Sequence, residues 1–163
     1  STGKSLLSEQ LAKHYNTTWV TEVARSYLQN LSRPYNFDDL SVIAKLQLAE
    51  EERLSKTANN FLFCDTNLIV IKVWSDFKYG RTEKWITDAI QKSDYSLHLL
   101  TEIDLPWEDD PLREHPQFRR QLFELYVQEL NNFELGYQTV SGIGECRLKN
   151  ALNHIEKLKP HLK

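Results

Sequence analysis

The amino-acid sequence predicts an α/β fold, in which helices alternate with the strands of a parallel sheet. Short β-rich or apolar runs occur at residues 18–23, 60–66, 95–101 and 137–142, and longer amphipathic segments separate them. The run that ends at Asp65 is continuously apolar, as expected for a parallel strand buried on both faces. This alternation is typical of a three-layer arrangement, with right-handed crossovers and helices on both faces of the sheet.

The first half of the chain predicts a series of helices. Apolar residues spaced by four indicate one helix directly after the opening STGKS. The next long helix is expected to begin at Asp38 or Asp39, acting as N-cap, and to run to about Lys56. The segment 68–74 is rich in β-branched residues and could be a strand. An Asp-Thr pair shortly before it is a good helix cap, which favours a helix.

The second half continues the alternation. Amphipathic patterns over 81–93, 118–133 and 146–159 predict further helices. The stretch 102–116 is polar and interrupted by prolines, so it is expected to be a loop. We therefore treat residues 1–163 as one domain, which suits a chain of this length.

The composition narrows the classes of function. Twenty Lys and Arg against 23 Asp and Glu give a formal net charge of −3, which offers no support for nucleic acid as a partner. The longest apolar run is broken by Lys72 and is too short to span a bilayer. Cys64 and Cys146 lie far apart and form no CxxC pair, which predicts a reduced, cytoplasmic protein without a zinc site.

The opening residues match the second half of a phosphate-binding loop. That loop has the pattern GxxxxGK followed by Ser or Thr, and here Gly3, Lys4 and Ser5 supply its end. In such a loop backbone N–H groups surround phosphate, the Lys reaches the β- and γ-oxygens, and the hydroxyl binds Mg²⁺. The first glycine and the strand before it would lie upstream, so we expect the domain to be N-terminally incomplete. The alternative is a helix start that contains these residues by chance.

An acid at the end of an apolar strand forms the second candidate element. Asp65 follows such a run where a phosphate-loop protein has a Mg²⁺-binding acid, and it would hold the ion directly or through water. The alternative is that its carboxylate caps the following helix. The loop and the strand-end acid strengthen each other as signals.

Glu22 and Arg25 stand at the end of the first strand run, and the carboxyl ends of strands are where α/β sheets bind ligands. The carboxylate could take a proton from a substrate hydroxyl, and the guanidinium could orient that acid or the transferred phosphoryl group. Spacing alone favours a simpler interpretation, a surface ion pair between residues three apart on a helical turn.

The segment 104–113 is predicted to be a mobile lid that closes over a nucleotide. It brings Trp107, several acids and Arg113 together in a loop with few apolar residues. Lids of this kind commonly bring an Arg to the charge that develops on the transferred phosphoryl group. Arg119 and Arg120 are rivals for that role. The alternative is a solvated loop whose tryptophan is buried in the core.

Together these motifs resemble the nicotinamide-riboside kinase domain of NadR-type proteins, a group of P-loop kinases. The likeness covers nearly the whole chain and includes STGKS, the E-x-A-R of 22–25, the Asp-Thr of 65–66, and the V-W-S and Y-G of 73–80. The P-W-x-D-D-x-L-R string at 106–113 is its most specific part. The resemblance extends to Arg147.

The resemblance implies a P-loop kinase fold with a parallel sheet of about five strands. It also implies that ATP, with Mg²⁺ as cofactor, phosphorylates the 5′-hydroxyl of nicotinamide riboside to give nicotinamide mononucleotide. The candidate catalytic residues are Lys4, Glu22, Asp65 and Arg113. The candidate ATP ligands are Ser1, Thr2, Gly3, Lys4, Ser5, Leu6 and Arg147, with Ser5 and Asp65 for Mg²⁺. The candidate substrate-binding residues are Trp19, Glu22, Arg25, Gln47, Trp107, Asp109 and Asp110.

Two classes of function stay open at this point. One is a small-molecule kinase for nicotinamide riboside or another nucleoside. The other is a regulatory ATPase module, in which a bound nucleotide switches a contact with a partner. A kinase needs an acceptor pocket with a base, for which Glu22 is the candidate. A switch needs only a segment that the γ-phosphate orders.

Overall fold

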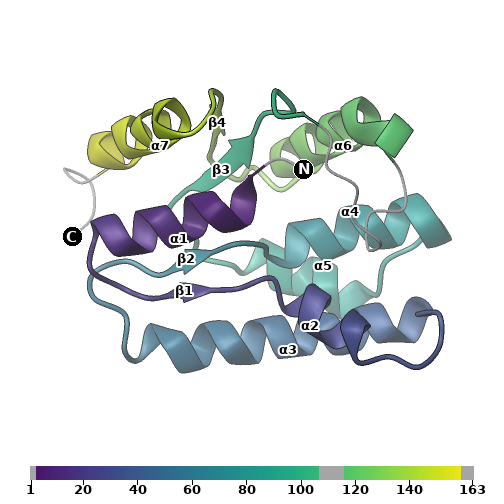
Figure 1. Ribbon diagram of the computed structural model, residues 1–163. Coiled ribbons are helices and arrows are strands. Elements are labelled where there is room, and N and C mark those ends of the chain that lie inside the picture. Colours follow the sequence, from purple (N-terminus) through teal and green to yellow (C-terminus); the bar gives the residue numbers. More distant parts are fainter. Residues whose placement is uncertain (1–2, 107–115, 159–163) are drawn as a thin grey trace. The chain divides into compact units, whose positions relative to one another are not determined.

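The computed structural model describes residues 3–106 and 116–158 and divides into two compact units. One contains residues 12–93 and is called the middle unit here; the other combines residues 1–11 with 94–163 and is called the terminal unit. Each unit contains one pair of parallel strands together with helices (Figure 1). The alternation of parallel strands and helices confirms the predicted α/β class.

The middle unit is built on the shortest strands of the described chain. β1 (Trp19–Val20) pairs in parallel with β2 (Phe63–Cys64). Helix α3 packs against β1, α2 and α4, and α4 packs against α5; Figure 1 shows α3 alongside the strand pair. The helices of this unit are α2 (Val23–Gln29), α3 (Phe37–Ser55), α4 (Leu68–Tyr79) and α5 (Lys84–Gln91).

Apolar side chains from β1 and three helices form the core of the middle unit. Burying each such side chain stabilises the fold by about 1.5–3 kcal/mol. The most deeply buried in β1, α3, α4 and α5 are Val20, Leu40, Ile43, Ala44, Val73, Ile86 and Ile90.

The predicted start of the long helix was wrong by two to three residues. The N-cap of α3 is Asn36, whose side chain accepts hydrogen bonds from the backbone N–H groups of Asp38 at 3.0 Å and Asp39 at 3.2 Å. The Asp39 carboxylate in turn accepts from the Asn36 N–H at 2.7 Å. This reciprocal capping box uses an acid at the third helical position, so the aspartates lie inside the first turn.

The prediction of a helix over 68–74 is confirmed, but its cap is different. Asn67 caps α4, because its side-chain oxygen accepts from the Ile69 N–H at 3.1 Å. The helix ends at Gly80, whose left-handed backbone (φ 67°) lets its N–H reach the Asp76 carbonyl at 2.9 Å. Since Asn67 is the capping residue, the interpretation of Asp65 as the helix cap was wrong.

In the terminal unit, β3 (His98–Thr101) pairs in parallel with β4 (Tyr137–Val140). Helix α7 packs against β4, and the short helix η1 packs against α6. Helix α1 begins here and its last turn belongs to the middle unit. The helices are α1 (Lys4–His14), η1 (Pro116–Phe118), α6 (Arg119–Asn132) and α7 (Glu145–Leu158).

A second apolar core lies in the terminal unit, formed by Leu7, Leu11, Leu130, Val140, Ala151 and Ile155. The structure confirms the two strands predicted near 95–101 and 137–142. It also confirms the three helices predicted over 81–93, 118–133 and 146–159, which correspond to α5, α6 and α7. Among residues 3–106 and 116–158, no helix combines the length and the apolar character that crossing a membrane requires.

Candidate nucleotide-binding and acceptor sites

Gly3 has the backbone geometry that a phosphate-binding loop needs. Its φ of 70° lies in the left-handed region that side chains disfavour. A Cβ atom at this position would lie 2.9 Å from Leu105 Cδ1 and 3.9 Å from Arg147 Cδ, so the Leu105 side chain would have to shift to admit one. Only glycine suits the position directly before α1. Ser1 and Thr2, the other predicted members of the loop, lie outside the described residues.

The first turn of α1 carries no negative charge that would oppose an anion. The helix begins at Lys4 and has no acidic residue in its first turn. The first N–H groups of any helix lack partners within the helix, and its dipole favours an anion at this end. Lys4 is half-buried, Ser5 is exposed and Leu6 is 58% exposed. This end of α1 therefore suits a phosphate group.

Arg147 is held by other residues of the terminal unit. It is 4% exposed, its Nη2 contacts the Asp104 carboxylate, and its Nε donates to the Gly142 carbonyl at 2.8 Å. Asp104 also accepts from the Gly142 N–H at 2.6 Å. Because the guanidinium is engaged in this way, its contacts favour a role in shaping the site beside Gly3. Direct contact with ATP stays a prediction.

In the middle unit, Glu22 and Asp65 follow two paired parallel strands at their carboxyl ends. Val20 is in register with Cys64, and the Asp65 N–H donates to the Val20 carbonyl at 2.9 Å. Asp65 is buried, at 7% exposure, whereas the Glu22 side chain is 29% exposed. The strand pairing therefore brings these two predicted acids to one edge of the sheet, where α/β proteins bind ligands.

Glu22 and Arg25 form the ion pair that their spacing suggested. The Arg25 Nε lies 3.4 Å from the Glu22 Oε2, and the two side chains are 38% and 29% exposed. The predicted strand over 18–23 was too long, because β1 ends at Val20 and α2 begins at Val23. A pair this exposed contributes at most about 1 kcal/mol, so a ligand can displace it at small cost.

Gln47 is buried and directed at the loop that contains Asp65. It is 1% exposed, and its Nε2 donates to the Thr66 carbonyl at 2.9 Å and to the Glu51 Oε1 at 2.7 Å. Trp19, another predicted substrate contact, is half-buried on β1.

The lid prediction falls mostly on residues that the structure does not describe. Trp107, Asp109, Asp110 and Arg113 all lie in the stretch between the two described ranges. Of the rival arginines, Arg119 donates from Nη2 to the Leu105 carbonyl at 2.9 Å. Arg120 pairs with Glu124 at 2.9 Å.

The candidate ligand atoms are carboxylate and hydroxyl oxygens, which suit Mg²⁺ better than a softer metal. Within the described ranges there is no group of three or more His, Cys, Asp and Glu side chains that could hold an ion. Mg²⁺ usually needs only one or two carboxylates, together with substrate phosphates, so the buried Asp65 carboxylate suits its chemistry. A Ser5 hydroxyl as a second protein ligand stays a prediction. Burial and the Glu51 charge raise the pKa of the Cys64 thiol to about 12, which keeps it neutral and inert.

Two acids that hold other segments in place were not identified in that role from the sequence. Asp104 was expected only as the first residue of the lid segment 104–113, yet it contacts an arginine 43 residues away. Asp39 appeared only as a possible helix cap, yet it also binds Arg33 and Tyr27. No local pattern predicts such partners, because each depends on how distant segments pack.

Comparison with known proteins defines the family. The AAA domain family matches residues 1–147, and the chain belongs to that family. Its likeness to NadR proteins, expected from the motifs, is confirmed in two curated relatives. Both are named trifunctional NAD biosynthesis/regulator protein NadR. The Escherichia coli protein is 28% identical over 144 residues, which cover 82% of this chain and 35% of the relative. The Salmonella typhimurium protein is 29% identical over 117 residues, which cover 69% and 28%.

A solved structure shows the same fold. The crystal structure of a NadR protein in complex with NR superposes with a TM-score of 0.81 at 21% identity, over 96% of this chain and 48% of that one. This match confirms the predicted P-loop kinase fold. The chain spans only about a third of the length of the curated relatives it matches.

Proposed function

We propose that this chain is an ATP-dependent phosphotransferase that phosphorylates the 5′-hydroxyl of a nucleoside, most favourably nicotinamide riboside. The observation that carries the proposal is Gly3, whose left-handed backbone disfavours a side chain, directly before Lys4 and Ser5 at the start of α1. The choice of nucleoside is supported by the NadR protein solved with NR, taken here as nicotinamide riboside.

The proposed roles follow from the chemistry of each side chain. As the acceptor oxygen bonds to the γ-phosphorus, the bond from that phosphorus to the β–γ bridging oxygen breaks and ADP leaves. Glu22 takes the proton of the hydroxyl and Arg25 orients Glu22. Lys4 neutralises charge on the β- and γ-oxygens. When bound, Mg²⁺ supplies further charge neutralisation, with Ser5 and Asp65 as its protein ligands.

A regulatory nucleotide-binding module is the second candidate. The names of the curated relatives, which combine biosynthesis with regulation, are the observation in its favour. In that case the chain would bind or slowly hydrolyse ATP without transferring phosphate to a nucleoside.

One assay separates the two. The purified chain is incubated with Mg²⁺, ATP and each of several nucleosides, and both ADP and the nucleoside monophosphate are measured. We expect nicotinamide mononucleotide to appear in step with ADP. A nucleoside present at 100 times its Kd should also stabilise the fold by about 2.7 kcal/mol. ADP formation that no nucleoside changes would support the regulatory module, and a chain that ATP does not stabilise would contradict both candidates.

A further inference from the structure

We propose that Gln47 is a positioning residue for Asp65, and that it does not contact the substrate. Gln47 holds the turn after β2 in the one conformation that directs the Asp65 carboxylate to Mg²⁺. This inference rests on the proposed function, in which Asp65 is a ligand of Mg²⁺. It replaces the expectation that the Gln47 side chain binds the nucleoside.

The contacts of the Gln47 amide leave it no donor for a substrate. An amide nitrogen carries two hydrogens. In Gln47 these are directed at the Thr66 carbonyl, 2.9 Å away, and at the Glu51 Oε1, 2.7 Å away. The residue is 1% exposed, so a nucleoside could reach it only if both bonds broke. Breaking a hydrogen bond to a buried group costs about 1–3 kcal/mol.

The backbone around Asp65 is fixed on both sides. Its own N–H donates to the Val20 carbonyl of β1 at 2.9 Å. The carbonyl of the next residue, Thr66, accepts from Gln47 of α3 at 2.9 Å. The carboxylate therefore extends from a segment tied to a strand and to a helix. Preorganisation of this kind tunes metal ligands, and loss of such a supporting contact typically lowers metal affinity 10- to 100-fold.

Glu51 determines which way the Gln47 amide faces. A carboxylate can only accept, so it selects the NH₂ group of the amide and opposes the flipped orientation. In the flipped orientation the amide oxygen would face the Thr66 carbonyl, and the two acceptors would repel. Gln47 and Glu51 lie one helical turn apart on α3, so the pair forms within a single helix.

The test uses variants that separate the helix pair from the bond to Thr66. Gln47→Glu removes both donors at constant shape, and Gln47→Met removes them without adding charge. The double variant Gln47→Glu/Glu51→Gln reverses donor and acceptor, so it restores the pair but still leaves the Thr66 carbonyl without a donor. Ser75→Ala is the matched control, since Ser75 is 1% exposed and donates to the Arg81 carbonyl at 2.6 Å in the same unit.

Two measurements are made on each variant. The first is the Mg²⁺ concentration that gives half of the thermal stabilisation by a non-hydrolysable ATP analogue. The second is amide hydrogen exchange over residues 65–67, which reports the turn itself and needs no ligand. We expect a rise of about tenfold or more in the Mg²⁺ requirement for both Gln47 variants and for the double variant. Exchange at 65–67 should become faster in these variants, and Ser75→Ala should change neither quantity.

The outcomes distinguish the inference from the function on which it rests. Unchanged exchange in both Gln47 variants, or a double variant that restores the wild-type Mg²⁺ requirement, would overturn the positioning role. So would an unchanged Mg²⁺ requirement accompanied by a higher nucleoside KM. Faster exchange with an unchanged Mg²⁺ requirement and nucleoside KM would uphold Gln47 as the residue that holds the turn. It would overturn Asp65 as a metal ligand. If Gln47→Glu does not fold, Gln47→Met alone decides.

Discussion

At the scale of single residues, a glycine, a lysine and a serine in succession form the proposed phosphate site. Gly3 adopts a left-handed backbone, and an added Cβ would collide with Leu105. For a residue with a side chain, this conformation costs about 1–2 kcal/mol before any collision. The left-handed backbone therefore gives a physical reason for a glycine before Lys4, which the sequence motif alone does not give.

Lys4→Ala should abolish ATP-dependent turnover and leave the fold intact. The half-buried side chain is the cation nearest in sequence to Gly3, and removing one preorganised stabilising group typically costs about 10²–10³ in rate. Turnover and the circular dichroism melt are measured together. A folded variant with near-normal turnover would end the phosphate-loop interpretation.

Glu22 and Asp65 should divide the acid chemistry between them. Asp65→Ala is expected to raise the Mg²⁺ requirement, because a buried carboxylate at a strand end is the better metal ligand. Glu22→Ala should lower kcat by about 10²–10⁴ without that change, as loss of a general base does. Mg²⁺ titrations of the two variants decide the assignment. A raised requirement in Glu22→Ala, and not in Asp65→Ala, would reverse it.

Arg113 is predicted to act mainly in the transition state. Its loss should lower kcat by about 10³-fold or more, with a smaller effect on the Kd of an ATP analogue. Arg119→Ala is the matched comparison, and it should mainly lower stability, because Arg119 supports the Leu105 carbonyl. If instead Arg113→Ala keeps the wild-type kcat while Arg119→Ala or Arg120→Ala lowers it strongly, the arginine that stabilises the transition state belongs to α6.

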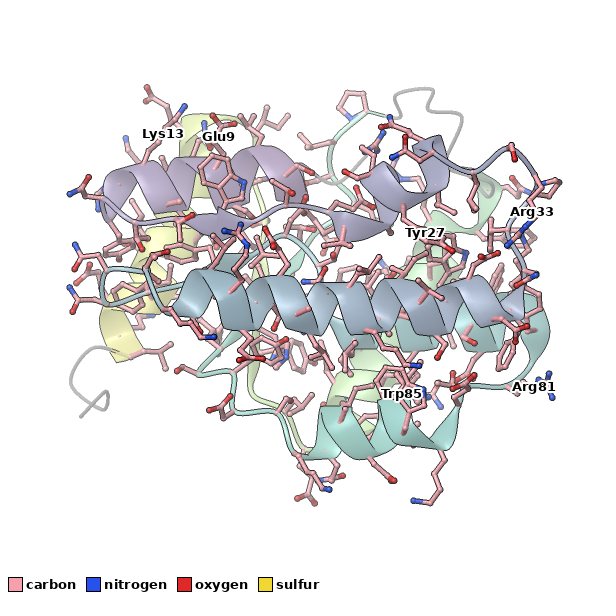
Figure 2. All side chains as sticks on the ribbon, turned by 90° about the horizontal axis from the view of Figure 1, so that it is seen from below. Glu9, Lys13, Tyr27, Arg33, Arg81 and Trp85 are labelled. Atoms are coloured by element: carbon pink, nitrogen blue, oxygen red, sulfur yellow. The ribbon has the colours of Figure 1, made fainter. Side chains whose placement is uncertain are left out.

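At the scale of whole elements, α2 follows directly on Glu22, carries Arg25 and lies at the surface of the middle unit. It has no buried residue, and α3 anchors it through the Tyr27 hydroxyl, which donates to Asp39 Oδ1 at 2.7 Å. Figure 2 shows Tyr27 between α2 and α3, and Arg33 on the loop that joins them. Arg33 donates to both Asp39 oxygens, at 2.7 and 2.9 Å.

These bonds predict a pH-dependent stability. The Arg33 guanidinium, with the backbone N–H of Asn36 and the Tyr27 hydroxyl, holds the pKa of Asp39 well below its usual range. A carboxyl whose pKa is lower in the folded state stabilises the fold fully above its unfolded pKa of about 3.9, and this contribution is lost as the pH falls below it.

Asp39→Asn should therefore lower the melting temperature by several degrees near pH 7, and the difference from wild type should shrink below about pH 4. The matched control is Asp38→Asn, because Asp38 is its exposed neighbour in the same helical turn. Melts across this pH range provide the measurement. A difference that stays constant down to pH 3, or an equal loss in Asp38→Asn, would contradict the role of this network.

At the scale of the whole molecule, each unit has its own parallel strand pair and its own apolar core. A single domain with one sheet of about five strands stays a prediction. The formal charge of −3 gives the chain no general attraction to nucleic acid, so small molecules are the partners we propose. The family match over residues 1–147 and the fold shared with a NadR protein are consistent with the chemistry proposed for this chain.

The sequence by itself determined the features that depend on neighbours along the chain. The helix of 37–55 follows from local periodicity, and a capping signal just before 68–74 favoured the helix there over a strand. Gly3–Ser5 and Asp65 follow from short motifs. Such patterns act within a few residues, so one sequence suffices to predict them. The same reasoning misplaced the N-caps of these two helices, because several polar residues near each helix start could act as the N-cap.

Only the tertiary structure decided which buried polar groups meet. Gln47 and Thr66 are 19 residues apart, and Asp104 and Arg147 are 43 apart, so no periodic pattern links them. The packing that buries Gln47 and Arg147 removes water, and each then needs a partner supplied by another segment. That requirement turned two residues predicted to touch ligands into residues whose observed contacts support the strand-end turn and the loop beside Gly3.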